Sequence, residues 1–121
     1  ILSIFCAQIG AKKVYSVEAS GLSAVIKDVA AENDVADRVC VIPKKLEDIG
    51  VEEVEIIDII ISEWMGFYLV HEGMLNTIIT ARERFLVGNG LLFPCIAKLY
   101  AAPCQVPEFH DFWKNVFGVQ M

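Results

Sequence analysis

The sequence predicts an α/β protein in which a parallel sheet carries helices on both faces. Two observations lead to this fold class. Segments typical of strands alternate with segments typical of helices over the first ninety residues, which is the pattern of consecutive βα units. The composition is also 55% hydrophobic, as expected where parallel strands are buried on both faces. The 121 residues are enough for one modest core.

Each element follows from a local pattern. Residues 1–10 have the character of the back half of a helix, and Gly10 is suited to end it. The apolar run EIIDIII predicts a buried central strand, which should end next to a charged loop. In chain order we expect a strand at 13–17, a helix at 22–32, a strand at 39–42, the central strand at 56–62, a helix at 72–85, and a turn at 88–90 leading into a strand at 91–93.

The alternation stops at Pro94, where we expect a domain boundary. Proline cannot donate a hydrogen bond to a continuing ladder, so it is suited to the end of a strand. Beyond it, residues 97–102 predict a new strand, and Pro103 and Pro107 interrupt the segment that follows. We therefore divide the chain into a partial nucleotide-binding domain at 1–93 and the start of a β-rich domain at 94–121.

Composition excludes several classes of protein. The net charge of −6 argues against nonspecific nucleic-acid binding and is compatible with basic, arginine-rich partners. The sequence lacks the eighteen or more consecutive apolar residues of a membrane span. Its four cysteines lack the spacing of a zinc site, so we expect reduced thiols and no metal.

Two glutamates nine positions apart are the most informative feature. Glu63 follows the predicted central strand and Glu72 opens the predicted helix, with Trp64, Met65 and Gly66 between them. Two carboxylates brought together repel unless a cation lies between them, and a planar guanidinium matches carboxylates with several N–H donors. The structural alternative is that Glu63 is a solvated loop charge and that Glu72 complements the helix N-terminus.

The stretch SEWMGFYLVHEGML at 62–75 resembles the double-glutamate loop of the protein arginine methyltransferases. Gly73 stands where the family usually has serine. Other segments are similar to the family in the same order, namely AKKVYSVEAS at 11–20, LNTIITARERFL at 75–86, GLLFP at 90–94 and FWKNVFGVQM at 112–121. By this resemblance the chain is identified as a central fragment of the catalytic core, similar to the type I enzymes.

The resemblance implies a Rossmann-like S-adenosylmethionine-dependent methyltransferase fold, followed by the beginning of a β-barrel domain. It also implies methyl transfer to arginine in histone tails and Gly/Arg-rich proteins, giving monomethyl and asymmetric dimethylarginine. The intact enzyme is expected to be a homodimer in the cytoplasm and nucleus, without direct nucleic-acid or membrane binding. Pro94 is expected to follow a cis peptide bond at the hinge between the domains.

The resemblance also assigns the site residues. Glu63 and Glu72 are the expected catalytic residues, and Leu46 and Glu47 are expected to contact the adenine of S-adenosylmethionine. Asp48 is an alternative to Glu47, and the residues alone would equally suit a solvated acidic loop. Met74 is expected beside the cofactor and the substrate nitrogen.

Glu18 is the expected ribose ligand. An acid that ends the second strand of a nucleotide-binding unit accepts hydrogen bonds from the ribose, about 20 residues after a glycine-rich turn. Counting back places that turn at or before Ile1, so the first strand and the glycine-rich loop of the domain at 1–93 are expected to be missing. The 121 residues alone are therefore expected to bind the cofactor poorly or not at all. Glu18, Glu63 and Glu72 should share one edge of the sheet.

Two alternatives stay open. The chain could be a noncatalytic or pseudo-enzyme interaction module with the same fold, or a Rossmann enzyme that uses another nucleotide cofactor. Within the loop we expect Trp64 to pack in the core, His71 to be exposed, and Gly66 to permit a tight or left-handed turn.

Overall fold

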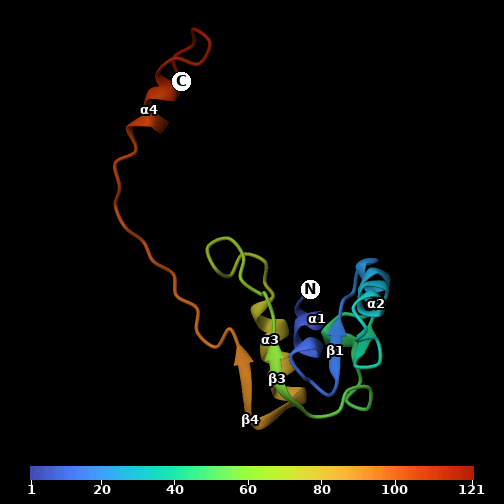
Figure 1. Cartoon of the computed structure of the whole chain (residues 1–121). Helices are drawn as coiled ribbons and strands as arrows, with labels where there is room; N and C mark the ends of the chain where they lie inside the picture. Colours follow the sequence, from blue (N-terminus) through green and yellow to red (C-terminus); the bar gives the residue numbers. More distant parts are fainter.

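The computed structural model describes the backbone of residues 1–121 and every side chain except that of Phe109. Helices and strands alternate up to residue 93, as the sequence predicts (Figure 1). The elements are α1 (Leu2–Gln8), β1 (Val14–Val17), α2 (Leu22–Glu32), β2 (Val39–Ile42), the 3₁₀ turn η1 (Leu46–Asp48), β3 (Ile57–Ile61), α3 (Leu75–Phe85), β4 (Leu86–Phe93) and α4 (Pro107–Lys114).

Helices cover both faces of the strands. Successive strand residues point to opposite faces, and two apolar clusters reflect this alternation. Val14 of β1 packs with buried residues of α1 and α2, whereas its neighbour Tyr15 packs on the other face with Phe85 of α3. This arrangement confirms the predicted α/β class with helices on both faces.

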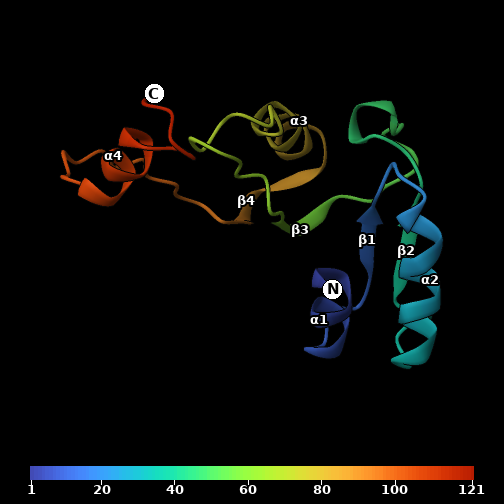
Figure 2. The same ribbon diagram turned by 90° about the horizontal axis from the view of Figure 1, so that it is seen from above.

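The described strands pair in parallel, as predicted, and form two ladders. β1 pairs with β2 and β3 pairs with β4, both parallel. Figure 2 shows β1 and β2 grouped with α1 and α2, and β3 and β4 grouped with α3. A cavity of about 650 Å³ is lined by residues of both β1 and β3. Because no ladder joins these two strands, β3 is an edge strand among the described residues and not a central one.

Strand β4 differs from the sequence prediction at its glycines. The turn expected at 88–90 is instead an irregularity inside one strand, since Ile57 pairs with Leu86 while Ile59 pairs with Leu91. A Cβ atom at Gly90 would lie 2.9 Å from the backbone oxygen of Asp58. The strands approach too closely there for any side chain, so glycine lets β4 bulge and still pair.

Helix α3 begins at Leu75, three residues after the predicted start at Glu72. Gly73 has a φ of +71°, a left-handed conformation that a right-handed helix cannot include. The helix can therefore start only after it, and Glu72 lies in the preceding loop. Gly10, with a φ of +107°, ends α1 as predicted.

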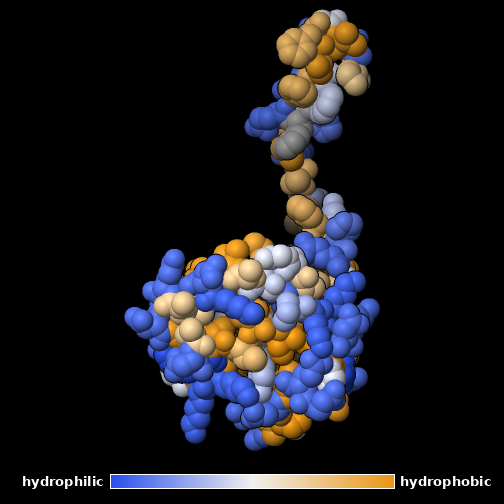
Figure 3. Space-filling view, turned by 90° about the vertical axis from the view of Figure 1, so that its right-hand side faces the viewer, coloured by the Kyte–Doolittle hydropathy of each residue, from blue (hydrophilic) through white to orange (hydrophobic). Residues whose placement is uncertain are grey.

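Beyond Pro94 the chain leaves the body as an extended arm that carries α4 (Figure 1). The Phe93–Pro94 peptide bond is cis, as predicted. The strand expected at 97–102 is absent from the described backbone, because an isolated extended segment has no ladder without a partner strand. Apolar residues lie along the arm (Figure 3), and Ile96, Leu99 and Tyr100 are largely exposed. No helix in the described chain has the length and apolar character needed to cross a membrane.

Candidate functional site

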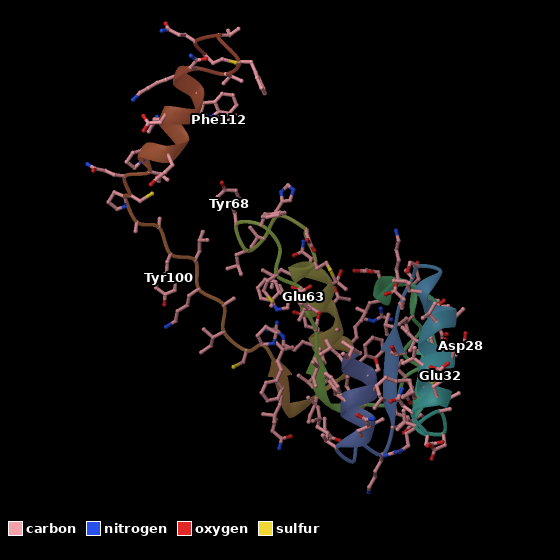
Figure 4. All side chains as sticks on the ribbon, turned by 45° about the horizontal axis from the view of Figure 1, so that its top comes forward. Asp28, Glu32, Glu63, Tyr68, Tyr100 and Phe112 are labelled. Atoms are coloured by element: carbon pink, nitrogen blue, oxygen red, sulfur yellow. The ribbon has the colours of Figure 1, made fainter. Side chains whose placement is uncertain are left out.

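The cavity is lined by residues along β1 and β3 and by acidic residues that follow each strand. Glu18 directly follows β1, and Glu63 lies two residues after the end of β3. Figure 4 shows Glu63 near the start of the loop that leads from β3 to α3, with Tyr68 at the tip of that loop. Five of the six predicted site residues line this cavity, namely Glu18, Leu46, Glu47, Glu63 and Met74.

Glu18 is held at the end of β1 by its backbone and its side chain. Its N–H donates to the carbonyl of Ile42 at 3.1 Å, which extends the pairing of β1 with β2 by one residue. The backbone N–H of Ser20 donates to Glu18 Oε1 at 2.8 Å, and this bond holds the pKa of Glu18 below its usual range. The carboxylate therefore stays charged at neutral pH, with Ser20 as its hydrogen-bond partner.

Glu47 is connected to α3 through both its side chain and its backbone. Thr77 Oγ1 donates to Glu47 Oε1 at 2.5 Å, and this bond is the main cause of the lowered pKa of Glu47. Arg84 Nη1 donates to the Glu47 carbonyl at 3.3 Å, and Arg84 Nη2 donates to the carbonyl of Ile49. Asp48 is not among the residues that line the cavity, so the geometry favours Glu47 over Asp48 as a ligand contact.

Glu63 stands beside a buried tryptophan. The N–H of Ser62 donates to the carbonyl of Phe93 at 3.0 Å, so the pairing of β3 with β4 continues up to the residue before Glu63. Trp64 is 8% exposed, which confirms the prediction that it packs in the core, and its indole N–H has no acceptor among the described residues. Trp64 thus fixes the base of the loop while Glu63 faces the cavity.

The loop after Trp64 folds tightly back on itself. Gly66 and Leu69 exchange backbone hydrogen bonds of 3.2 and 2.9 Å. The tight turn expected at Gly66 is present, but the left-handed residues are Tyr68 and Leu69, with φ values of 50° and 71°. Positive φ values in side-chain-bearing residues cost roughly 1–3 kcal/mol each and occur often at functional sites.

Glu72 lies in this loop, outside the set of residues that line the cavity. Its Cγ atom lies over Gly66, 2.6 Å from the position that a Cβ atom there would occupy. In the described chain neither Glu63 nor Glu72 makes an ion pair or a side-chain hydrogen bond. Both carboxylates are exposed and have all their acceptor positions available to a cationic guest.

Sequence reasoning missed Thr77, Arg84 and Ser20. Thr77 and Arg84 are seven positions apart on α3, which places them on one helical face with Met74. This stripe, in which Met74 and Thr77 line the cavity and Arg84 bonds to the η1 turn, could have been found from the helical period. Ser20 would have been found from the short E-x-S spacing after a strand, where a backbone N–H turns back to the acid.

The arrangement can hold a ligand that has both apolar and hydrogen-bonding parts. The cavity is lined by apolar strand residues and by three carboxylates, those of Glu18, Glu47 and Glu63. Charged carboxylates accept hydrogen bonds from hydroxyl and amino groups. The described side chains include no group of three His, Cys, Asp or Glu that could hold a metal ion. The fold and the site define an α/β protein with a cavity next to the carboxyl ends of parallel strands, the place where open α/β sheets bind ligands.

Comparison with known proteins gives the family. A probable protein arginine N-methyltransferase 6 from Arabidopsis thaliana is 47% identical over 125 residues, which cover 100% of this chain and 28% of that protein. The structure of Arabidopsis thaliana protein arginine methyltransferase 10 matches with a TM-score of 0.82 and 34% identity, over 99% of this chain and 39% of that one.

The Trypanosoma brucei PRMT1 enzyme–prozyme heterotetrameric complex with AdoHcy matches with a TM-score of 0.75 and 33% identity, over 98% of this chain and 38% of that one. No family model matches the chain. The chain belongs to the protein arginine N-methyltransferase family. It spans about a third of the length of the curated relatives that it matches.

Proposed function

We propose that the full-length protein transfers methyl groups from S-adenosylmethionine to arginine side chains of proteins. The observation that carries the proposal is the placement of Glu18, Glu47 and Glu63 around one cavity at the ends of β1 and β3. Family membership supports it, and so does the AdoHcy, the demethylated form of the cofactor, in the Trypanosoma brucei complex.

Glu18 and the η1 turn would bind the nucleoside part of the cofactor. The Glu18 carboxylate would accept hydrogen bonds from the ribose hydroxyls. Leu46 would pack on the adenine, and Glu47 would accept a hydrogen bond from its amino group while Thr77 holds the other carboxylate oxygen. The cofactor supplies an electrophilic methyl group, and these residues orient it towards the Glu63 end of the cavity.

Glu63 and Glu72 would bind the substrate guanidinium. Arginine is a weak nucleophile because its guanidinium stays protonated and its charge is delocalised. Paired carboxylates draw that charge towards the nitrogens they contact, and the nitrogen that faces the methyl group is left more electron-rich. Holding both reactants in line is worth up to roughly 7–11 kcal/mol in favourable cases. Either glutamate can then accept the proton that the methylated nitrogen releases.

Met74 would set the space beside the reacting nitrogen. It caps the N-terminus of α3 and lines the cavity, between the expected cofactor and arginine positions. We propose that its side chain limits the number of methyl groups that fit, and that the products are monomethyl and asymmetric dimethylarginine, as in type I enzymes.

The wider biological setting is also proposed from the family. Histone tails and Gly/Arg-rich proteins are the proposed substrates, and the net charge of −6 suits such basic partners. We further propose a homodimer located in the cytoplasm and nucleus. Residues 1–93 would be part of a Rossmann-like domain, and residues 94–121 would lead into a β-barrel domain that pairs with the extended arm.

The proposal is tested with the full-length protein, S-adenosylmethionine and a Gly/Arg-rich peptide. Mass spectrometry should find one and then two additions of a methyl group on arginine, and the same peptide with every arginine replaced by lysine should stay unmodified. Transfer to the lysine peptide would contradict the guanidinium clamp. Binding of the cofactor without any transfer would favour a noncatalytic interaction module.

A further inference from the structure

Gly66 and Glu72 are in unusually close contact. A Cβ atom built on Gly66 would lie 2.6 Å from Cγ, 3.1 Å from Cδ and 3.2 Å from Cβ of Glu72. Real Cβ atoms essentially never approach another heavy atom within 3.0 Å. The Glu72 side chain therefore occupies the space that any other residue at position 66 would need.

Backbone conformation does not explain glycine at this position. Gly66 is absent from the residues with positive φ, whereas Gly73 in the same loop has a φ of +71°. A Cβ atom at Gly73 would meet nothing within 4 Å. Glycine is therefore needed at the two positions for different reasons. Gly73 provides a left-handed turn before α3, whereas Gly66 leaves room for a side chain.

The backbone around Gly66 is held in place, so the side chain of Glu72 is the group that can move. Reciprocal hydrogen bonds with Leu69 hold Gly66 in place, and the adjacent Trp64 is buried. Glu72 is exposed and makes no side-chain hydrogen bond among the described residues. If the two groups compete for space, the Glu72 side chain will rotate away because nothing else restrains it.

We propose that Gly66 is a positioning residue for Glu72. Because Gly66 has no side chain, the carboxylate of Glu72, the second of the clamp, can cross the loop backbone. This inference rests on the proposed function, in which Glu72 binds the substrate guanidinium. A misplacement of about 1 Å in a reacting constellation can reduce the rate on the order of 100-fold. The effect should fall on arginine binding and turnover, and not on the cofactor or the fold.

The test compares Gly66→Ala with Gly88→Ala in the full-length protein. We expect Gly66→Ala to reduce kcat/KM for an arginine peptide on the order of 100-fold, with affinity for S-adenosylhomocysteine and Tm close to wild type. Gly88→Ala introduces the same methyl group where nothing lies within 4 Å and φ is not positive, outside the loop that carries Glu72, so its turnover should stay close to wild type.

A double-mutant cycle separates positioning from a structural role. Because Gly66→Ala is expected to act only through Glu72, the combination Gly66→Ala/Glu72→Gln should be no slower than Glu72→Gln alone. Additive losses, or a fall in Tm or cofactor affinity in Gly66→Ala, would overturn the inference, and so would normal turnover of this variant beside an inactive Glu72→Gln. Normal turnover of Glu72→Gln would instead remove the clamp, and with it the proposed function.

Discussion

Arg84 connects α3 to the turn that carries the proposed adenine-binding residues, and Arg84→Met tests this connection. Its guanidinium donates to the carbonyls of Glu47 and Ile49, and methionine keeps most of the apolar stem while removing both donors. The bond to Ile49 is part-buried and the bond to Glu47 is exposed at 3.3 Å. Removal of the bond to Ile49 should therefore account for most of the lost stability.

The magnitude follows from these two bonds. A hydrogen bond to a charged group contributes about 1.5–3 kcal/mol, and Ile49 is only 1% exposed, so water cannot replace its lost donor. We expect a decrease of about 2–3 kcal/mol in the free energy of unfolding. Loosening of the η1 turn should also weaken cofactor affinity about tenfold, which corresponds to about 1.4 kcal/mol.

The assay is calorimetric titration of the full-length protein with S-adenosylhomocysteine, together with urea unfolding. Arg82→Met is the matched control, because Arg82 is on the same helix and makes only an exposed 3.4 Å pair with Glu83, which contributes little. Equal effects of the two substitutions would refute the idea that Arg84 holds the turn. So would a less stable Arg84→Met protein with unchanged cofactor affinity.

Three further predictions concern the rest of the cavity and the strands. Gly90→Ala should destabilise the protein by about 1–3 kcal/mol through overpacking, because its Cβ would meet Asp58 and Leu86. Gly88→Ala has open space and should leave the free energy of unfolding nearly unchanged, as urea unfolding of both variants can measure. Thr77→Val should weaken cofactor binding in calorimetry while Thr77→Ser, which keeps the hydroxyl donor to Glu47, should preserve it; unchanged binding in Thr77→Val, or a loss in Thr77→Ser alone, would show that the methyl group matters and not the bond. The folded-state pKa values of Glu18 and Glu47 lie below their usual range. Their stabilising contribution is therefore present above the unfolded pKa of about 4.3 and is lost as pH falls through the lower folded pKa values. Urea unfolding across this acid range should show a weaker pH dependence of stability in Thr77→Val, and an unchanged pH profile would contradict the role of the Thr77 bond.

Much of the fold could be predicted because local patterns determine it. The helix at Leu22–Glu32 and the strand at Val39–Ile42 have the predicted bounds, since helix formers and β-branched residues there agree with the tertiary context. The start of α3 was predicted wrongly because the conformation of Gly73 is a property of the loop path and not of the helical pattern. Strand β4 was predicted too short because its bulge depends on the approach of Asp58 in another strand.

The pairing of strands was beyond what sequence patterns could supply. Local apolar runs predict which segments are strands, but ladders depend on the neighbours available to each edge. β1 and β3 face one cavity without sharing a ladder, and the segment at 97–102 has no partner within the described chain. Both differences from prediction therefore arise because strand pairing depends on segments far apart in the sequence.

The candidate site was predicted residue by residue, and its supports were not. Acids after strands and the SEWMG loop pointed to Glu18, Glu47 and Glu63, which the structure brings to one cavity. The contact between Gly66 and Glu72 and the bond from Thr77 to Glu47 join residues whose proximity no spacing rule gives. Sequence thus indicated the groups with a proposed chemical function, while the structure supplied the residues that contact them.

The central claim is that one cavity separates cofactor binding at Glu18 from arginine chemistry at Glu63. The most direct test measures the Kd for S-adenosylhomocysteine and kcat for an arginine peptide in the same full-length variants. Glu63→Gln keeps the shape but removes the charge, so it should nearly abolish turnover with Kd unchanged. Glu18→Ala should weaken Kd because the ribose contact is lost. Normal turnover in Glu63→Gln, or unchanged cofactor affinity in Glu18→Ala, would contradict the account.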